Sequence, residues 1–356
     1  MLETRSWKAM ARYTEGLKLV QAFQDGRDWS QLAKAEDQLA TAAELDQQFR
    51  EAAFYLAVIR ELRGKHEQAA QDFEKIRLYS PSDPEVLYNL GIAYFHQYEW
   101  EAYKRAVVYL KDAVETASTD LRKVLSQPRS PRKNRGSVVQ DQTRLYSIEF
   151  LSRSVLAQVY AHMTIRPAYE VDEYAGAVET NYDLALSEAN AALVQTDNWS
   201  GDAEVSADVR AGAHNAIGLA NMYRAQRVQE GIEQLLRDAV EQFGLALTLN
   251  PDDARLLSNL GSATLFLAEN FKRAGREEWI PALTRAESLF KRVLELRPNY
   301  DFAYCRLARI AIARGDGKTA ENYVRLAAEH PSEMTPQYLE RLRRQIQELP
   351  FRPNQS

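Results

Sequence analysis

Residues 50–83 read REAAFYLAVIRELRGKHEQAAQDFEKIRLYSPSD, and this stretch predicts two helices joined by a tight turn. Apolar residues recur at steps of three and four on both sides of Gly64, the spacing that places side chains on one face of a helix. Glycine suits the left-handed backbone that such a turn requires. Pro81 then follows the second helix, which proline closes because it lacks a donor N–H. The stretch therefore predicts a helical hairpin of 34 residues.

The second helix of this hairpin carries a spacing that recurs elsewhere in the chain. An alanine is followed by a phenylalanine four residues later and by a proline eight residues after that. The three occurrences are Ala69, Phe73 and Pro81; Ala239, Phe243 and Pro251; and Ala286, Phe290 and Pro298. We expect each alanine to admit a neighbouring helix and each ring to fill the gap beside it. Repetition of this kind predicts a stack of similar hairpins.

A glycine lies in the middle of the preceding helix in three of the hairpins, at Gly91, Gly218 and Gly261. Glycine inside a helix costs about 1 kcal/mol relative to alanine. A cost that recurs at equivalent positions indicates close contact between helices, where a side chain would hold the partner away. Ala57 and Ala308 occupy the matching positions of two other segments.

The hairpins differ in length. The segments 50–83 and 301–334 keep the 34-residue frame, and 16–49 fits it more weakly. The other hairpins carry additional residues between their two helices, and we expect these insertions to project from one edge of the stack. Trp100 and Trp279 lie in this inserted rim, where they either pack or anchor a partner.

Small residues in the first helix, followed by alanine, a large apolar residue and a terminal proline in the second, resemble the tetratricopeptide repeat (TPR) family. The resemblance implies an all-α fold, a right-handed superhelical solenoid of helix-turn-helix hairpins. It also implies that the first helix of each hairpin lines a concave groove in which protein partners lie.

Aligning the hairpins of this chain with the TPR pattern gives thirteen candidate groove residues. They are Phe54, Val58, Tyr88, Ile92, Phe95, Asn215, Leu219, Met222, Ser258, Asn259, Ser262, Arg306 and Arg309. The alternative for each is packing between hairpins. The aromatic residues toward the amino end favour an amphipathic helix or extended peptide over the carboxylate clamp of chaperone-binding TPR proteins. The arginine pair toward the carboxy end favours an acidic partner segment.

A basic segment with two prolines, residues 119–143, interrupts the hairpins, and we predict a mobile loop there. Its basic residues are Arg122, Lys123, Arg129, Arg132, Lys133 and Arg135. The loop divides amino-terminal hairpins, 1–118, from carboxy-terminal hairpins, 144–349, which end in a capping helix, 335–348, before a tail, 350–356. The basic residues are either simply solvated or bind an acidic protein or nucleic acid.

The composition places limits on the function. A net charge of −5 over 356 residues argues against a protein that binds nucleic acid with its whole surface. Cys305 is the only cysteine, which fits a reducing compartment. Residues 1–20 lack a signal-peptide core, and no uncharged apolar run reaches the roughly 20 residues of a membrane-spanning helix. We therefore expect a cytoplasmic protein without membrane insertion.

The sequence contains no recognisable catalytic constellation, so we predict neither an enzyme nor a cofactor or metal. The five histidines lack the His-x-x-x-His spacing of a metal site. The glycines Gly315 and Gly317 resemble a phosphate-binding loop, but in register they form the turn between two helices. Cys305 has no evident base beside it in the sequence.

These observations favour a non-catalytic scaffold or adaptor that mediates protein–protein interaction in a larger complex. The alternative is a nucleic-acid-associated accessory protein that uses the basic loop together with Arg306 and Arg309. An enzyme with a site of unfamiliar type is a third hypothesis, which the absence of a convergent polar cluster disfavours.

Overall fold

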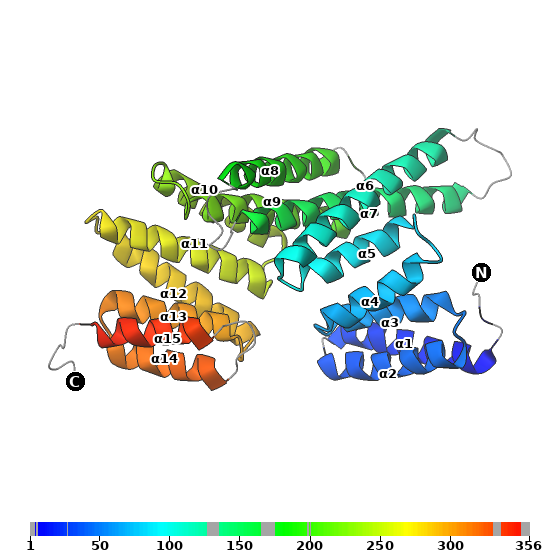
Figure 1. The fold of residues 1–356 in the computed structure, drawn as a ribbon, viewed down its shortest axis with the longest axis horizontal. Helices are drawn as coiled ribbons and strands as arrows, with labels where there is room; N and C mark the ends of the chain where they lie inside the picture. The colour runs from blue at the N-terminus through cyan, green and yellow to red at the C-terminus, as the bar shows by residue number, and fades with distance from the viewer. Residues whose placement is uncertain are drawn as a thin grey trace. The chain divides into compact units, whose positions relative to one another are not determined.

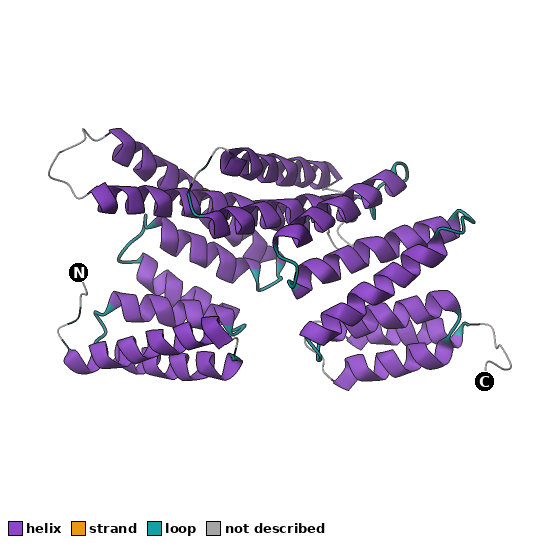
Figure 2. Cartoon of the chain, turned by 180° about the vertical axis from the view of Figure 1, so that it is seen from behind, coloured by secondary structure: helices purple, strands orange, loops and turns teal. Residues whose placement is uncertain are grey.

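The structure is a computed structural model that describes residues 4, 6–26, 28–126, 135–164, 175–197, 199, 201–329 and 336–349. These residues form helices and connecting turns without a strand, which confirms the predicted all-α class (Figure 1, Figure 2). The helices are α1 (Trp7–Gly26), α2 (Trp29–Leu45), α3 (Arg50–Leu62), α4 (His66–Arg77), α5 (Pro84–Phe95), α6 (Trp100–Ser126), α7 (Arg135–Met163), α8 (Ala175–Asp197), α9 (Ala203–Arg224), α10 (Ile232–Leu249), α11 (Ala254–Arg273), α12 (Trp279–Leu296), α13 (Asp301–Arg314), α14 (Gly317–Glu329) and α15 (Pro336–Gln347). Among the described helices, none combines the length and the apolar character that a membrane crossing requires.

The chain forms two compact units, which we describe separately. Unit 1 comprises residues 1–159 and 194–206, and unit 2 comprises residues 160–193 and 207–356. The division predicted from the sequence lies within the loop 119–143 instead. The capping helix predicted at 335–348 corresponds closely to α15, and the tail 350–356 lies outside the described residues.

Both ends of the predicted loop are helical, because α6 continues to Ser126 and α7 begins at Arg135. Ala113, Ala117 and Leu121 are buried at steps of four, so the apolar face of α6 extends past residue 118. This periodicity outweighs the polar, basic composition of the segment. Residues 127–134 lie outside the described part of the chain.

The two segments with a clean 34-residue frame fold as predicted. The segment 50–83 forms α3 and α4, and the segment 301–334 contains α13 and α14. Gly64 and Gly315 adopt left-handed backbone, with φ of 77° and 78°, at the turns between these helices. The insertions of the other hairpins are accommodated largely by longer helices, and Trp100 and Trp279 begin α6 and α12.

The glycines of the first helices touch the large residues of the second helices, as the spacing predicts. A Cβ atom on Gly218 would lie 2.7 Å from the ring of Phe243, and one on Gly261 would lie 2.9 Å from the ring of Phe290. Both rings are fully buried. In unit 1 a Cβ atom on Gly91 would meet Leu110 at 2.6 Å. The missing side chain therefore sets how closely the two helices of a hairpin approach.

Most helix contacts in each unit join neighbours along the chain. In unit 1, α1 packs on α2, α3 on α4 and α5 on α6, and successive hairpins meet through α2 with α3 and α4 with α5. In unit 2, α10, α11, α12, α13 and α14 each pack on the helix that follows. Contacts that skip one helix join α3 with α5, α11 with α13 and α13 with α15. First helices of successive hairpins therefore lie close enough to share polar contacts.

We predict that Gly218→Ala destabilises unit 2 by about 1 to 2 kcal/mol. Overpacking against a buried ring costs about 1 to 3 kcal/mol, and the better helix propensity of alanine returns up to about 1 kcal/mol. Urea unfolding of the full chain, followed by circular dichroism, measures the change. The matched control is Gly244→Ala in α10, where nothing lies within 4 Å of the added Cβ. An equal loss of stability in both variants would contradict the close-contact interpretation.

Candidate functional site

The amino-terminal candidate residues form a partly exposed aromatic and apolar set on α3 and α5. Phe54, Val58, Tyr88 and Ile92 are half-buried, whereas Phe95 is buried. The ring of Phe54 lies 5.6 Å from that of Phe73, so it packs on the second helix of its own hairpin. The set therefore contributes to packing and retains a limited accessible surface.

The candidates on α9 and α11 are mostly buried. Asn215, Leu219, Met222, Ser258 and Ser262 have little exposed surface. Half-buried Asn259 donates a hydrogen bond to the Asn215 side-chain oxygen at 2.9 Å. Their burial favours packing between hairpins over the groove surface predicted from the sequence.

The two arginines of α13 have different environments in unit 2. Arg309 donates to both carboxylate oxygens of Glu269 on α11, at 2.6 and 2.7 Å, and its charge is therefore neutralised. The Arg306 guanidinium carbon lies 4.4 Å from the ring centroid of Phe302 and 5.3 Å from that of Phe266. Contacts of this geometry between a cation and an aromatic face are attractive.

Arg306 has no ion pair among the described residues, and its Nε has no hydrogen-bond partner there. Burial, together with the charge of Arg309, lowers its pKa from the ordinary arginine value. Arginine nevertheless keeps its charge in proteins. The two rings hold this charged side chain in place before any ligand arrives. Arg306 is therefore the candidate residue for binding an anionic group of a partner.

The lone cysteine is part of the core. Cys305 is fully buried, and this burial raises the pKa of its thiol to about 12. A thiol with such a pKa remains protonated at neutral pH and is a poor nucleophile.

The two rim tryptophans are half-buried, and the two basic residues of the predicted loop that the structure describes with their side chains make polar contacts within α6. Trp100 and Trp279 are half-buried, with Lys104 and Lys272 over their rings at 6.0 and 4.8 Å. Arg122 and Lys123 lie on α6. Arg122 donates to Ser118 and Thr119, and Lys123 pairs with Asp120 at 2.8 Å. Arg129, Arg132 and Lys133 lie outside the described residues, as does the side chain of Arg135.

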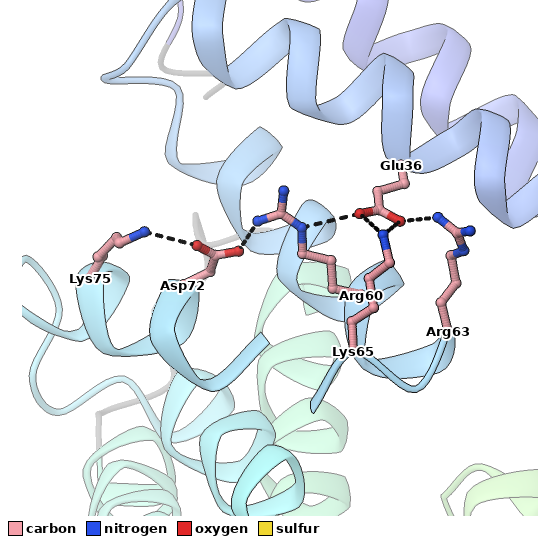
Figure 3. A network of polar contacts seen from close by, with 6 residues as sticks. All are labelled: Glu36, Arg60, Arg63, Lys65, Asp72 and Lys75. Carbon is pink, nitrogen blue, oxygen red and sulfur yellow. Dashed lines mark hydrogen bonds and ion pairs between the residues drawn. The ribbon is translucent and has the colours of Figure 1, made fainter. Parts of the chain in front are cut away.

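Sequence reasoning missed a charged network in unit 1 that joins α2 to the hairpin α3–α4 (Figure 3). The carboxylate of Glu36, 8% exposed, accepts from Arg60 at 3.3 Å, from Lys65 at 2.8 and 2.9 Å, and from Arg63. Arg60 also pairs with Asp72. Burial disfavours the charged Glu36, but these three cations outweigh it and lower its pKa. The cluster is internally paired, so its role is structural.

We predict that Glu36→Gln weakens unit 1 by about 1.5 to 3 kcal/mol at neutral pH, the typical contribution of hydrogen bonds to charged groups. Because the pKa of Glu36 is lower in the folded than in the unfolded chain, its charged form stabilises the fold. This stabilisation is fully present above the unfolded glutamate pKa of about 4.3. The difference between variant and wild type should therefore shrink as the pH falls below this value. Urea unfolding at pH 7 and pH 3 measures it.

The control for this prediction is Glu101→Gln, which removes one partner of an exposed pair with Lys104. Exposed pairs contribute little to stability, so this variant should unfold like the wild type. A Glu36→Gln effect that stays constant between pH 7 and pH 3 would show that the charge is not responsible.

The chain is similar to known proteins in its fold, but not in its sequence. No protein-family model matches the chain, and no curated protein sequence matches it. It is similar to a tetratricopeptide repeat protein from Parabacteroides merdae (12% identity, TM-score 0.48, 94% of this chain and 100% of that chain). It is also similar to PilF of Pseudomonas aeruginosa (14% identity, TM-score 0.43, 83% and 96%). A further similar structure is the TPR2AB domain of yeast Sti1 in complex with pHSP90 (14% identity, TM-score 0.27, 96% and 98%).

The chain thus resembles TPR proteins over nearly its whole length, as its repeat spacing predicts. At these identities the likeness concerns the arrangement of helices and carries no information about partners.

Proposed function

We propose that this chain is a non-catalytic scaffold that binds a protein partner, and that Arg306 on α13 of unit 2 receives a carboxylate of that partner. One observation carries the proposal. Arg306 lies against two aromatic rings, and in the described part of the chain no acidic side chain forms an ion pair with it.

The surroundings of Arg306 favour a carboxylate as the group it binds. The guanidinium presents donors in a planar fork that matches carboxylate geometry. Phe266 and Phe302 restrict the side chain before binding, so less conformational entropy is lost on association. Glu269 lies on α11 nearby, but it is engaged in a two-point pair with Arg309. Of the two arginines of α13, Arg306 is therefore the one whose charge a partner would neutralise.

The half-buried residues Phe54, Val58, Tyr88 and Ile92 are a second proposed contact, in unit 1. Their composition suits an apolar helix or an extended peptide rather than a charged one. This proposal rests on residue type and partial exposure, and it is independent of Arg306.

A protein partner is favoured over nucleic acid by the pairing of two cations that a nucleic-acid interface would use. Lys123 pairs with Asp120, and Arg309 pairs with Glu269. A phosphate backbone binds through several unpaired cations, and its affinity falls steeply with salt. Salt dependence therefore separates the two hypotheses.

We predict that Arg306→Ala weakens binding of the partner by about 10- to 100-fold, since a hydrogen bond to a charged group contributes about 1.5 to 3 kcal/mol. Proteins that co-purify with the tagged full-length chain from its native cells are identified by mass spectrometry. The affinity of the recovered partner is then measured for each variant. Circular dichroism confirms that the variant is folded.

The matched control is Arg325→Ala on α14, which removes an exposed arginine already paired with Glu329. It should bind the partner like the wild type. If Arg306→Ala recovers the same partner with the same affinity, the proposed role of Arg306 is wrong. If nuclease treatment abolishes recovery and affinity falls steeply with salt, the nucleic-acid hypothesis replaces it.

A further inference from the structure

Three side chains that are separated in the sequence converge in unit 1. Glu61 lies near the end of α3, His66 begins α4, and His96 directly follows α5. The Nδ1 atom of His66 lies 2.9 Å from Glu61 Oε2, and the Nδ1 atom of His96 lies 2.6 Å from Glu61 Oε1. One ligand atom from each residue lies within 4.8 Å of the other two.

The hairpin geometry brings these residues together. Gly64 turns the chain sharply with a φ of 77°, so that His66 faces back toward Glu61, five residues earlier. The packing of α4 on α5 then brings the end of α5 beside this turn. The imidazole rings of His66 and His96 come within 5.2 Å of each other, centroid to centroid. Two successive hairpins thus contribute to one cluster.

The chemistry of the cluster is that of a site for a divalent transition-metal ion. Two imidazoles and a carboxylate suit Zn²⁺, Ni²⁺ and Cu²⁺, whereas Mg²⁺ and Ca²⁺ prefer oxygen ligands alone. Ligands about 2.1 Å from such an ion are separated by about 3.0 to 3.4 Å at ordinary angles. The observed separations between Nδ1 and carboxylate oxygens, 2.6 and 2.9 Å, are already close to this range. To admit an ion, the side chains would move apart from these hydrogen-bonded positions.

The histidines have a tautomer that allows ligation. With the ring proton on Nε2, each Nδ1 presents a lone pair toward the place where the hydrogen bonds to Glu61 now lie. The ion would replace the two protons that Glu61 shares with the imidazoles. The side chains of His66 and His96 are 27% and 22% exposed, so solvent can reach the cluster and supply the remaining ligands.

The nearby basic residues do not compete for this carboxylate. Lys65 lies next to His66 in the sequence, but its ammonium group pairs with Glu36, as do Arg60 and Arg63 (Figure 3). The described contacts of the Glu61 carboxylate are those with the two histidines. Three cations pair with Glu36, whereas in the described part of the chain no lysine or arginine pairs with Glu61. A divalent cation would supply the missing positive charge.

We propose that Glu61, His66 and His96 bind one divalent transition-metal ion of the Zn²⁺ type, which joins the hairpin α3–α4 to the end of α5. The site is distinct from the proposed partner contact of Arg306 in unit 2. Its effect would be structural, since binding of the ion to the folded state alone stabilises the packing between two hairpins.

The test uses the full chain, freed of metal with a chelator. Isothermal titration calorimetry with ZnCl₂ should show one saturable site. Co²⁺ should give the visible absorption of a site with nitrogen and oxygen ligands. His66→Gln and His96→Gln should each weaken Zn²⁺ binding at least tenfold, and the same Zn²⁺ concentration should raise the melting temperature of the wild type more than that of these variants.

The matched control is His214→Gln, which alters a histidine that contacts Gln242 in unit 2 and should bind Zn²⁺ like the wild type. Glutamine keeps a polar group at each position, and circular dichroism verifies folding. Should a histidine variant fail to fold, Glu61→Gln provides the same test, because it removes the charged ligand and retains a hydrogen-bond acceptor. Absence of saturable Zn²⁺ binding to the wild type, or unchanged binding to His66→Gln and His96→Gln, would overturn the proposal.

Discussion

In this chain a side chain of the second helix occupies the space that a missing Cβ leaves on the first helix. Phe243 lies over Gly218 and Phe290 lies over Gly261, and Leu110 meets Gly91 in the same way. Because the rings are fully buried, the distance between the two helices is set by these contacts rather than by flexible surface residues. The polar contacts of α11 and α13 depend on this spacing, since neighbouring hairpins stack on the helices it positions.

This constraint explains why much of the fold was predictable from sequence. The glycine, the alanine and the phenylalanine of one hairpin lie within about 30 residues of one another, and the turn glycines Gly64 and Gly315 mark the shortest hairpins. Local spacing therefore indicates each hairpin. The basic segment misled the prediction because its composition is that of a loop, whereas Ala117 and Leu121 continue the apolar face of α6. The division into two units depends on contacts between distant segments, which local spacing does not reveal.

The candidate sites were much less predictable, because charge pairing depends on which helix lies opposite. Arg306 and Arg309 are three residues apart and look equivalent in the sequence. Only the packing of α11 on α13 shows that Glu269 neutralises one of them. Glu36 is likewise 24 to 29 residues from its cations. His96 is 35 residues from Glu61, and no short spacing links them.

Most helices pack on their neighbours along the chain, and this has a consequence for how the molecule folds. Contacts between residues close in sequence require little loop closure, so contact order is low and individual hairpins can form quickly. Structure can then grow from one hairpin to the next, each supplying the surface on which its successor condenses. The same property lets a terminal hairpin open while its neighbours stay folded, so hydrogen exchange in such an array is expected to be graded along the chain rather than uniform.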